Sequence, residues 1–284
     1  MRHHFVPQFL LRAWADGSSD GKLQEFLVDH EGVPTSRRAP KGTGFQDDLY
    51  ALSKDNVAGM DKHAVEAKFL SRLDDEGAKI RRKLIEGKPL TGDEVAVWTT
   101  FVMGLRARQP AMVSKIKSAV AEAMRESIAK DPEQYQALAK AVDPPTLEEW
   151  AEQHFPGLIE NYGLSMLADI AGHEDVAAKV RKLLWGVMDV SKGKHDLMLS
   201  DQPCVWIGGI DAPQLIIALP LSPAKAFLAV RGEATANALV RADTAELAKR
   251  LNENSVGQAQ RRVYARDETA ADFVRDAMVR KKAS

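Results

Sequence analysis

The hydrophobic pattern of this chain changes its period twice, and that order limits the folds it can adopt. Apolar runs of strand length occupy residues 22–52, helical spacing dominates residues 60–185, and strand-length runs return from residue 186. Segregated blocks are typical of α+β folds, because α/β folds alternate their strands and helices. We therefore expect an α+β protein in which a small N-terminal β meander and C-terminal β-sheet segments join around or beside a large central helical block.

No internal repeat or low-complexity linker divides the 284 residues, so we predict one composite domain. Its first part, residues 1–55, is an N-terminal helix with a small β part. Residues 60–185 form the helical block, and residues 186–284 form a β-rich part with closing helices.

The helix predicted over residues 95–108 is very apolar. Thr91 with Glu94 three residues later is typical of a capping box, which starts a helix. The side chains expected deep in the core are those of Trp98, Phe101, Val102 and Leu105.

Charge and cysteine content restrict the environment and the partners. Lysine and arginine number 39 against 40 acidic residues, which argues against coating nucleic acid by bulk charge but leaves a local basic groove open. The only cysteine, Cys204, cannot form a disulfide within the chain and favours a reducing, cytoplasmic location. No run approaches the roughly 20 apolar residues of a membrane span, so no membrane partner is expected.

Several common catalytic motifs are absent from the sequence. It has no Gly-rich phosphate loop followed by Lys-Ser or Lys-Thr, no Gly-x-Gly-x-x-Gly, no Gly-x-Ser-x-Gly and no His-Glu-x-x-His. Nucleotide-driven motors, Rossmann oxidoreductases, α/β-hydrolases and zinc metalloproteases are therefore disfavoured. Cys204 lies in an apolar run and is interpreted as a small buried hydrophobic residue.

The first fifteen residues contain several side chains that could bind a ligand or transfer a proton. His3 and His4 are adjacent, and Pro7 then starts an apolar helix that anchors the segment in the core. Neighbours in an extended strand point to opposite sides, so we expect one histidine to face a site while the other packs or supports. The structural alternative is that both are ordinary polar N-terminal residues. Gln8 follows as a candidate substrate-binding residue.

Acidic and basic candidates come from the helical block. Glu66 lies among apolar neighbours and is predicted to turn inward as a supporting residue, whereas the acidic run 74–76 is interpreted as a solvated face. Arg106 and Arg108 end the apolar helix, where they either complement its dipole or bind a phosphate or carboxylate.

A polar turn separates two apolar runs in the C-terminal part. It reads Ser200-Asp201-Gln202-Pro203. Such a sequence is an ordinary turn, or it places Asp201 where the carboxylate could orient a histidine or bind a metal, with Ser200 in support.

Four stretches together resemble the bacterial family called domain of unknown function 4238. The N-terminal string is the most specific, and Leu10 and Trp14 are apolar replacements at two positions where the family pattern has Tyr and Phe. The resemblance implies that His3, His4, Gln8 and Asp201 occupy motif positions; it implies no activity. The matching stretches are residues 3–14, Ser200-Asp201-Gln202-Pro203, Pro220-Leu221-Ser222-Pro223 and the segment from Asn252 to Tyr264.

The leading hypothesis is a hydrolase, nuclease-like, acting on nucleic acid or a nucleotide in a phage-defence or toxin context. His3, His4 and Asp201 would be catalytic, and a divalent metal is an open option. The alternative is a non-catalytic binding or regulatory module in which the His-His end is structural. A third hypothesis is an interaction scaffold built on the central helices. The sequence leaves substrate, metal and oligomeric state undetermined.

Overall fold

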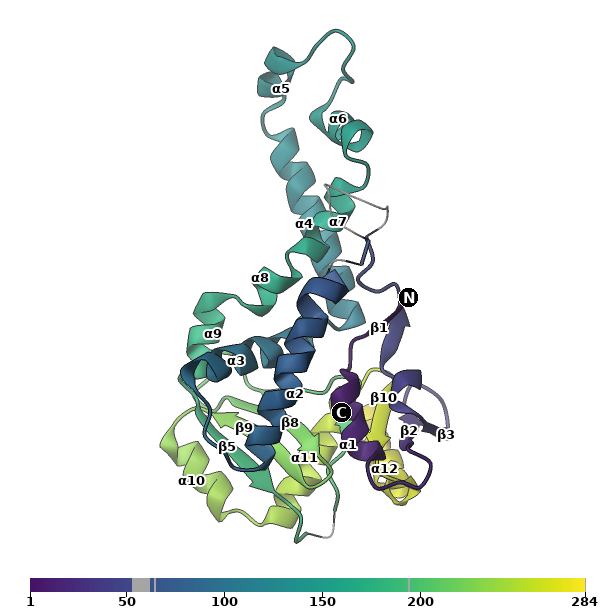
Figure 1. Cartoon of the computed structure of the whole chain (residues 1–284), viewed down its shortest axis with the longest axis vertical. Coiled ribbons are helices and arrows are strands. Elements are labelled where there is room, and N and C mark those ends of the chain that lie inside the picture. The colour runs from purple at the N-terminus through teal and green to yellow at the C-terminus, as the bar shows by residue number, and fades with distance from the viewer. Residues whose placement is uncertain (53–61, 64, 194, 284) are drawn as a thin grey trace.

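The computed structural model describes residues 1–52, 62, 63, 65–193 and 195–283. The fold is α+β, as predicted, with small antiparallel sheets below and a large helical block above them in Figure 1. The predicted start of the helical block, at residues 60 and 61, lies outside the described residues. No helix among those described is long and apolar enough to cross a membrane.

One four-stranded sheet joins the two ends of the chain. Its order is β3-β2-β10-β6, so two strands from the N-terminal part pair with two from the C-terminal part. This pairing confirms that the β segments of both ends join beside the helical block. The strands are β2 (Leu23–Leu27), β3 (Thr35–Arg38), β6 (Leu199–Ser200) and β10 (Arg262–Ala265).

The other strands form a separate four-stranded sheet and a short ribbon. The sheet has the order β5-β9-β8-β7, with strands β5 (Leu184–Asp189), β7 (Val205–Ile207), β8 (Ile216–Ser222) and β9 (Lys225–Val230). The ribbon pairs β1 (Arg2–His4) with β4 (Phe45–Asp47). It stands at the edge of the molecule near the N-terminus (Figure 1).

The helices form the central block and the closing segments. A π-helical turn (Val65–Leu70) leads into α2 (Ser71–Ile85), and two 3₁₀ turns cover Pro40–Gly42 and Glu268–Ala270. The remaining helices are α1 (Gln8–Ala15), α3 (Gly92–Ala107), α4 (Pro110–Ala129), α5 (Pro132–Leu138), α6 (Leu147–His154), α7 (Leu158–Ser165), α8 (Leu167–Ala171), α9 (Glu174–Arg181), α10 (Glu233–Arg241), α11 (Thr244–Gln258) and α12 (Ala271–Ala283).

Helix α1 ties the N-terminus into the core. Pro7 precedes its first turn, and Leu10, Leu11 and Trp14 are fully buried. The Trp14 indole N–H donates to the carbonyl of Leu197 at 2.7 Å, which links the first helix to the C-terminal half. Burying an aromatic side chain whose N–H is satisfied is strongly favourable, so this segment holds β1 in a fixed position.

Helix α3 runs through the centre of the core, as its pattern predicts. The capping box at Thr91 is present, and Trp98, Phe101, Val102 and Leu105 are all buried. The Trp98 ring stacks on Phe101 at 5.1 Å between centroids and meets Phe227 edge-on at 5.6 Å. This aromatic cluster fixes the helical block on the β5-β9-β8-β7 sheet.

Three local predictions differ from the structure. Residues 49–52, the last apolar run of the predicted β part at 22–52, form a turn and coil, and the backbone N–H of Tyr50 donates to the side chain of His3. Trp185, predicted as the end of a helix, lies in β5, where its ring packs edge-on against Phe227 at 5.2 Å. Helix α10 was not predicted, and none of its residues is buried.

Helices α4 and α7 form an arm that rises above the rest of the molecule, with α5 and α6 at its far end (Figure 1). The two helices approach closely at Gly163. A Cβ there would stand 2.9 Å from the Cα of Lys117 and 3.2 Å from the carbonyl oxygen of Ile116. Both are backbone atoms, so they cannot move aside as a side chain would.

Gly163→Ala should therefore destabilise the protein by about 1–3 kcal/mol, because a methyl group would force α4 and α7 apart. Gly257→Ala is the matched control. It lies in α11 with open space around its Cα, so alanine there should add about 0.5–1 kcal/mol of stability. Urea denaturation of both variants measures the two changes; equal effects at the two positions would contradict the close approach.

Candidate functional site

The β1–β4 ribbon presents two different faces. Pairing sets Arg2 opposite Asp47, His3 opposite Gln46 and His4 opposite Phe45. His3 is fully buried, His4 is partly buried and Arg2 is exposed. The two histidines thus lie on opposite faces, which is the alternation expected for a strand.

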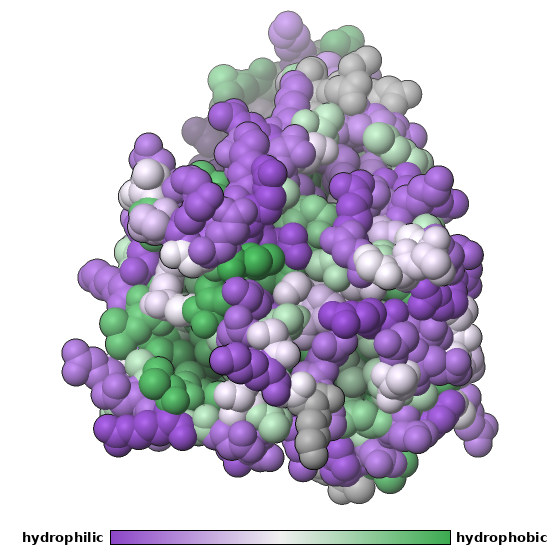
Figure 2. Space-filling view, turned by 60° about the horizontal axis from the view of Figure 1, so that its bottom comes forward, coloured by the Kyte–Doolittle hydropathy of each residue, from purple (hydrophilic) through white to green (hydrophobic). Residues whose placement is uncertain are grey.

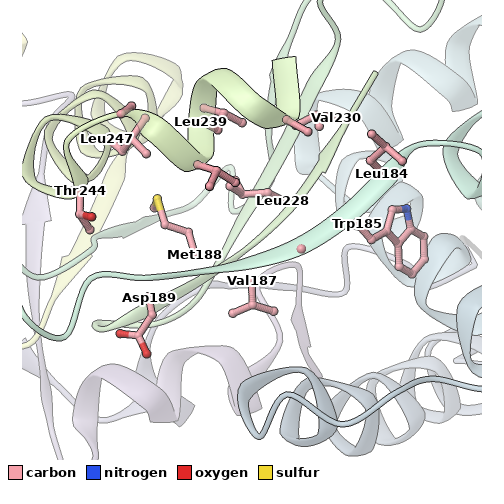
Figure 3. A pocket seen from close by; sticks show the side chains of 14 residues that line it. Leu184, Trp185, Val187, Met188, Asp189, Leu228, Val230, Leu239, Thr244 and Leu247 are labelled. Atoms are coloured by element: carbon pink, nitrogen blue, oxygen red, sulfur yellow. The ribbon is translucent and has the colours of Figure 1, made fainter. Parts of the chain in front are cut away.

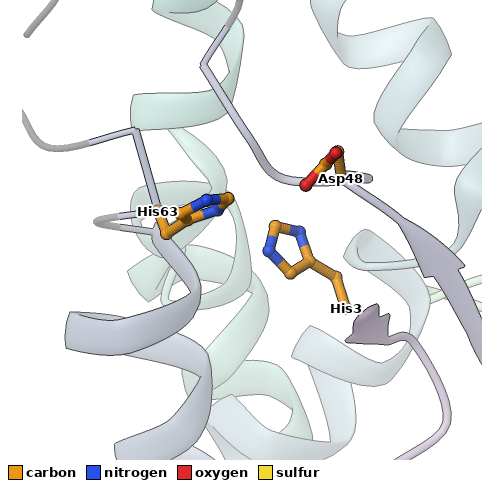
Figure 4. Close-up of side chains that lie close together, drawn as sticks. All are labelled: His3, Asp48 and His63. Carbon is orange, nitrogen blue, oxygen red and sulfur yellow. The ribbon is translucent and has the colours of Figure 1, made fainter. Parts of the chain in front are cut away.

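His3 is held by Tyr50. The backbone N–H of Tyr50 donates to His3 Nδ1 at 2.9 Å, and the two rings stack with centroids 5.4 Å apart and planes inclined by 6°. The ring of His3 lies between Asp48 and His63, and its Nε2 side faces His63 (Figure 4). The His3 and His63 rings meet edge-on at 5.3 Å.

These contacts fix the protonation state of His3. Burial, and then the nearby His63, lower the pKa of His3 from 6.5 to about 4, so the ring is neutral at pH 7. Since Nδ1 accepts the Tyr50 N–H, we assign the single ring proton to Nε2. Nε2 is buried and has no hydrogen-bond partner in the described part of the chain. His3 therefore presents an unsatisfied N–H donor beside His63.

His3, Asp48 and His63 offer ligand atoms that all lie within 4.8 Å of one another. Two of these residues are already engaged. His3 Nδ1 accepts the Tyr50 N–H, and Asp48 Oδ1 accepts from the Met1 ammonium at 2.7 Å. The remaining His3 nitrogen carries the proton and has no lone pair for a cation. Asp48 keeps a second carboxylate oxygen and His63 completes the group, so the three residues are also a candidate metal site, at which His3 would have to exchange its present hydrogen bond for the metal.

A buried network continues from Tyr50 to the end of α3. The Tyr50 hydroxyl donates to the carbonyl of Arg108 at 2.7 Å, and burial raises the pKa of Tyr50 well above its usual value. The Arg108 guanidinium, 1% exposed, donates to Asp74 Oδ1 at 2.8 Å. The carboxylate of Asp74 therefore neutralises the buried guanidinium of Arg108, although residues 75 and 76 of the same run are more open to solvent. The interpretation of the whole run as a solvated face is wrong for Asp74.

Glu66, on the π-helical turn, faces this network. Its Oε2 atom is buried without a hydrogen-bond partner among the described residues. Burial, with the nearby Asp74 charge, raises the pKa of Glu66 from 4.5 to about 7, although Arg108 opposes the shift. Glu66 turns inward, as predicted, and its carboxyl holds its proton in the pH range in which general acids and bases work.

Glu66 and His3 should give opposite pH dependences of stability. Because the pKa of Glu66 is raised by folding, its contribution is present below about pH 4.5 and is lost as the pH rises through about 7. Because the pKa of His3 is lowered, its contribution is present above about 6.5 and is lost as the pH falls through about 4. Within their shared window the two contributions offset each other.

Glu66→Gln should remove the Glu66 contribution to the pH dependence of stability and leave that of His3. We expect the variant to gain stability relative to the wild type as the pH rises from 5 to 8, by up to about 3 kcal/mol. Thermal unfolding at pH 5, 6, 7 and 8 measures the gain. A difference between variant and wild type that stays constant across this range would show that Glu66 keeps its ordinary pKa.

The outer face of the ribbon is basic and aromatic. The Arg2 guanidinium lies over the Phe45 ring at 4.5 Å, and the His4 ring meets Phe45 at 5.6 Å. Gln8 Nε2 lies 3.5 Å from His4 Nδ1, and Arg12 donates to Gln8 Oε1 at 3.5 Å. Burial and then the charges of Arg2 and Arg12 lower the pKa of His4. Gln8 and His4 therefore belong to one surface, on the face of the ribbon opposite His3.

Asp201 lies elsewhere in the fold. Its carboxylate accepts the backbone N–H groups of Gln260 at 2.9 Å, Arg261 at 2.7 Å and Arg262 at 2.9 Å, which fixes the entry to β10. Ser200 makes a local turn by bonding to the backbone of Gln202. In the described chain, the cluster that contains His3 is completed by Asp48 and His63, and Asp201 is not part of it. The expected sharing of one site by His3 and Asp201 is not what the structure shows.

Comparison with known proteins decides the family. The family described as "Protein of unknown function (DUF4238)" matches residues 2–269, nearly the whole chain. The chain belongs to this family. No curated protein and no solved structure matches it. The expected resemblance is thus confirmed, and the function of this DUF4238 protein has to be argued from its own geometry.

The two arginines of the predicted phosphate site have separate surroundings. Arg108 is enclosed with Asp74, as described above. Arg106 lies with its guanidinium 4.8 Å from the centre of the Trp206 ring, a cation–π contact on another side of α3. The structure of this DUF4238 protein therefore brings Arg108 and Glu66 toward the His3 cluster through Tyr50, and leaves Arg106 apart from them.

An apolar groove of about 330 Å³ is separate from the histidine cluster. Strand β5 and helix α10 form its walls (Figure 3), and apolar residues gather on this part of the surface (Figure 2). Its single charged lining residue, Asp189, lies 3.4 Å from Lys225. No group in the groove suggests acid–base chemistry, so we place the candidate site at the ribbon.

Sequence reasoning missed four residues of the site: Asp48, Tyr50, His63 and Asp74. Asp48 directly follows β4 and has a left-handed backbone conformation (φ 53°). The sequence of this segment does not predict that its side chain turns toward His3. His63 and Asp74 reach His3 and Arg108 only through the fold. A partial signal existed in Tyr50, an aromatic residue with a polar end in an otherwise apolar run, because a buried hydroxyl requires a partner.

Proposed function

We propose that this protein is a hydrolase of phosphate esters in nucleic acids or nucleotides, with His3, His63 and Asp48 at its centre. One observation supports it most: the buried Nε2–H of His3, without a partner in the described chain, lies beside two residues that are open to solvent. A buried donor left unsatisfied costs about 1–3 kcal/mol, so a ligand oxygen that accepts it accounts for its retention.

The roles follow from charge and position. His3 is neutral and fixed, so it donates a hydrogen bond to a phosphoryl oxygen and stabilises the charge that develops there. His63 is partly exposed and takes a proton from the attacking hydroxyl. Asp48, 51% exposed in its side chain, lies beside His3 and forms an ion pair with the Met1 ammonium at 2.7 Å. His4 and Gln8 would contact the substrate from the outer face.

A hydrolysis assay on the full chain tests this function. Single-stranded RNA, single-stranded DNA and nucleoside triphosphates would be incubated with the protein, once with Mg²⁺ and once with EDTA. His63→Gln should lower the rate by about 10²–10⁴-fold, the size of a general acid–base contribution. His30→Gln is the matched control, since His30 is exposed and pairs only locally with Asp29. No turnover of any substrate, or equal turnover in wild type and His63→Gln, would contradict the proposal.

Variants of His3 distinguish catalysis from anchoring. His3→Asn keeps an oxygen near the Nδ1 position for the Tyr50 N–H and removes Nε2, so the protein should fold while the rate falls by about 10²–10³-fold. His3→Ala removes both and should also lower the melting temperature.

A binding or regulatory module is the second candidate function. The observation that favours it is the stacking of His3 on Tyr50, whose hydroxyl bonds to the end of α3 and so pins the chain end to the helical block. This candidate expects both His3 variants to lose stability together and neither to change a rate. Thermal melting measured beside the assay separates the two functions.

A further inference from the structure

We propose that His3, Asp48 and His63 bind one divalent metal ion of the zinc type. One nitrogen of each histidine and one carboxylate oxygen of Asp48 hold the ion. This inference goes beyond the proposed function and does not rest on it, since ion binding is measured without turnover. It describes a second state of the same residues, in which His63 has given its lone pair to the ion and cannot take a proton.

The three side chains lie close to the geometry of a metal site. Their ligand atoms are all within 4.8 Å of one another, and the His3 ring lies between Asp48 and His63 (Figure 4). In a tetrahedral zinc site, bonds of about 2.0–2.1 Å place neighbouring ligand atoms about 3.3 Å apart, so these atoms have to move together by at most about 1.5 Å. Asp48 and His63 are open enough to solvent for their side chains to turn by this amount.

The types of ligand select the ion. Two imidazole nitrogens and one carboxylate oxygen suit Zn²⁺, whereas Mg²⁺ and Ca²⁺ prefer oxygen ligands. Three protein ligands leave the fourth position to water, and the half-exposed side chain of Asp48 gives the ion a path from solvent. The Met1 ammonium donates to Oδ1 of Asp48 at 2.7 Å, which orients the carboxylate and leaves Oδ2 for the ion.

The hydrogen bonds of His3 point to Nε2 as its ligand atom. Nε2 faces His63, and in the described part of the chain it is buried without a hydrogen-bond partner. A neutral imidazole has one lone pair, which in the ion-free protein lies on Nδ1 and accepts the backbone N–H of Tyr50 at 2.9 Å. When Nε2 binds the ion, the ring proton moves to Nδ1, and His3 therefore gives up its hydrogen bond with Tyr50.

Isothermal titration calorimetry of the full chain with Zn²⁺, after metals are removed with EDTA and the EDTA is dialysed away, tests the site. We expect one Zn²⁺ per chain and much weaker binding of Mg²⁺ in the same experiment. His63→Gln should weaken Zn²⁺ binding by more than about 100-fold, because loss of an outer-shell partner alone costs about 10–100-fold. Asp48→Asn, which removes the charge and keeps an oxygen, should weaken it by about 10–100-fold.

Two controls accompany these variants. The melting temperature of each variant without metal shows that it folds, which we expect because both positions are partly exposed. His30→Gln is the matched control, since His30 and Asp29 form an exposed histidine–carboxylate pair at 2.6 Å outside the cluster. Its affinity for Zn²⁺ should equal that of the wild type.

A second measurement reports on His3 without changing it. Zn²⁺ should speed up hydrogen exchange of the Tyr50 amide, followed by NMR, by about 2–10-fold, which corresponds to the loss of one hydrogen bond. The same Zn²⁺ concentration should leave this amide unchanged in His63→Gln.

The possible results decide the inference separately from the hydrolase function. Absence of Zn²⁺ binding, equal Zn²⁺ affinity in the wild type and His63→Gln, or Mg²⁺ binding as tight as that of Zn²⁺ would overturn the site. Zn²⁺ binding with unchanged exchange at Tyr50 would exclude His3 as a ligand and would overturn it as well. None of these measurements depends on hydrolysis, so failure of one proposal leaves the other standing.

Discussion

Arg108→Met should destabilise the protein by about 3–5 kcal/mol at pH 8, because it leaves the partly buried Asp74 without its counter-charge. The Arg108 guanidinium is 1% exposed and bonds to Asp74 at 2.8 Å. Methionine fills a similar volume, so the loss reports the charge and not a cavity. The Tyr50 bond would survive, since it goes to the backbone carbonyl of residue 108. Urea denaturation measures the loss.

The pH dependence of this variant gives a sharper check. The pKa of Asp74 is raised by burial even with Arg108 present, and removing the guanidinium should raise the pKa values of Asp74 and Glu66 further. Both carboxyls are then protonated at pH 5, so the loss at pH 5 should be smaller than at pH 8. The double variant with Asp74→Asn should recover part of the loss. A loss independent of pH, with no recovery in the double variant, would contradict the ion pair.

The fold class was predictable because burial leaves periodic marks in a sequence. The strand-length runs predicted from residue 186 onward include β7 and β9, and the apolar positions predicted for α3 are buried in the structure. Sheet partners were not predictable. The pairing of β2 with β10 joins residues more than 230 positions apart, and nothing in either strand specifies the other.

The site was predictable only where a residue type was unusual for its surroundings. His3 stood out as one of two adjacent histidines, and Glu66 as an acidic residue among apolar neighbours. His3 lies in the cluster with Asp48 and His63, and Glu66 faces the neighbouring network of Arg108 and Asp74. Asp201 stood out as an acidic residue in a polar turn between two apolar runs, yet a buried carboxylate also suits backbone N–H groups that lack partners. Sequence alone could not separate these two uses, because they differ in which atoms face the carboxylate and not in the residue itself.

Asp201→Ala should test that distinction by separating stability from activity. The carboxylate accepts three backbone N–H groups, from residues 260, 261 and 262, and its side chain is almost fully buried. Alanine would leave three donors unsatisfied at the start of β10, which should cost about 3 kcal/mol or more. Asp211→Asn is the matched control, since Asp211 is 72% exposed in a surface pair with Lys179 and should change stability by less than about 1 kcal/mol.

The activity readout decides the role of Asp201. Measured at a temperature where the variant is folded, the rate per folded molecule should stay within about twofold of the wild type, because neither the proton on His3 Nε2 nor the position of His63 depends on Asp201. His63→Gln should show the reverse pattern, with normal stability and a large loss of rate. If Asp201→Ala instead lost activity by 10²-fold or more while melting normally, the carboxylate would be catalytic. The active site would then lie at the end of β6 and not at the His3 cluster.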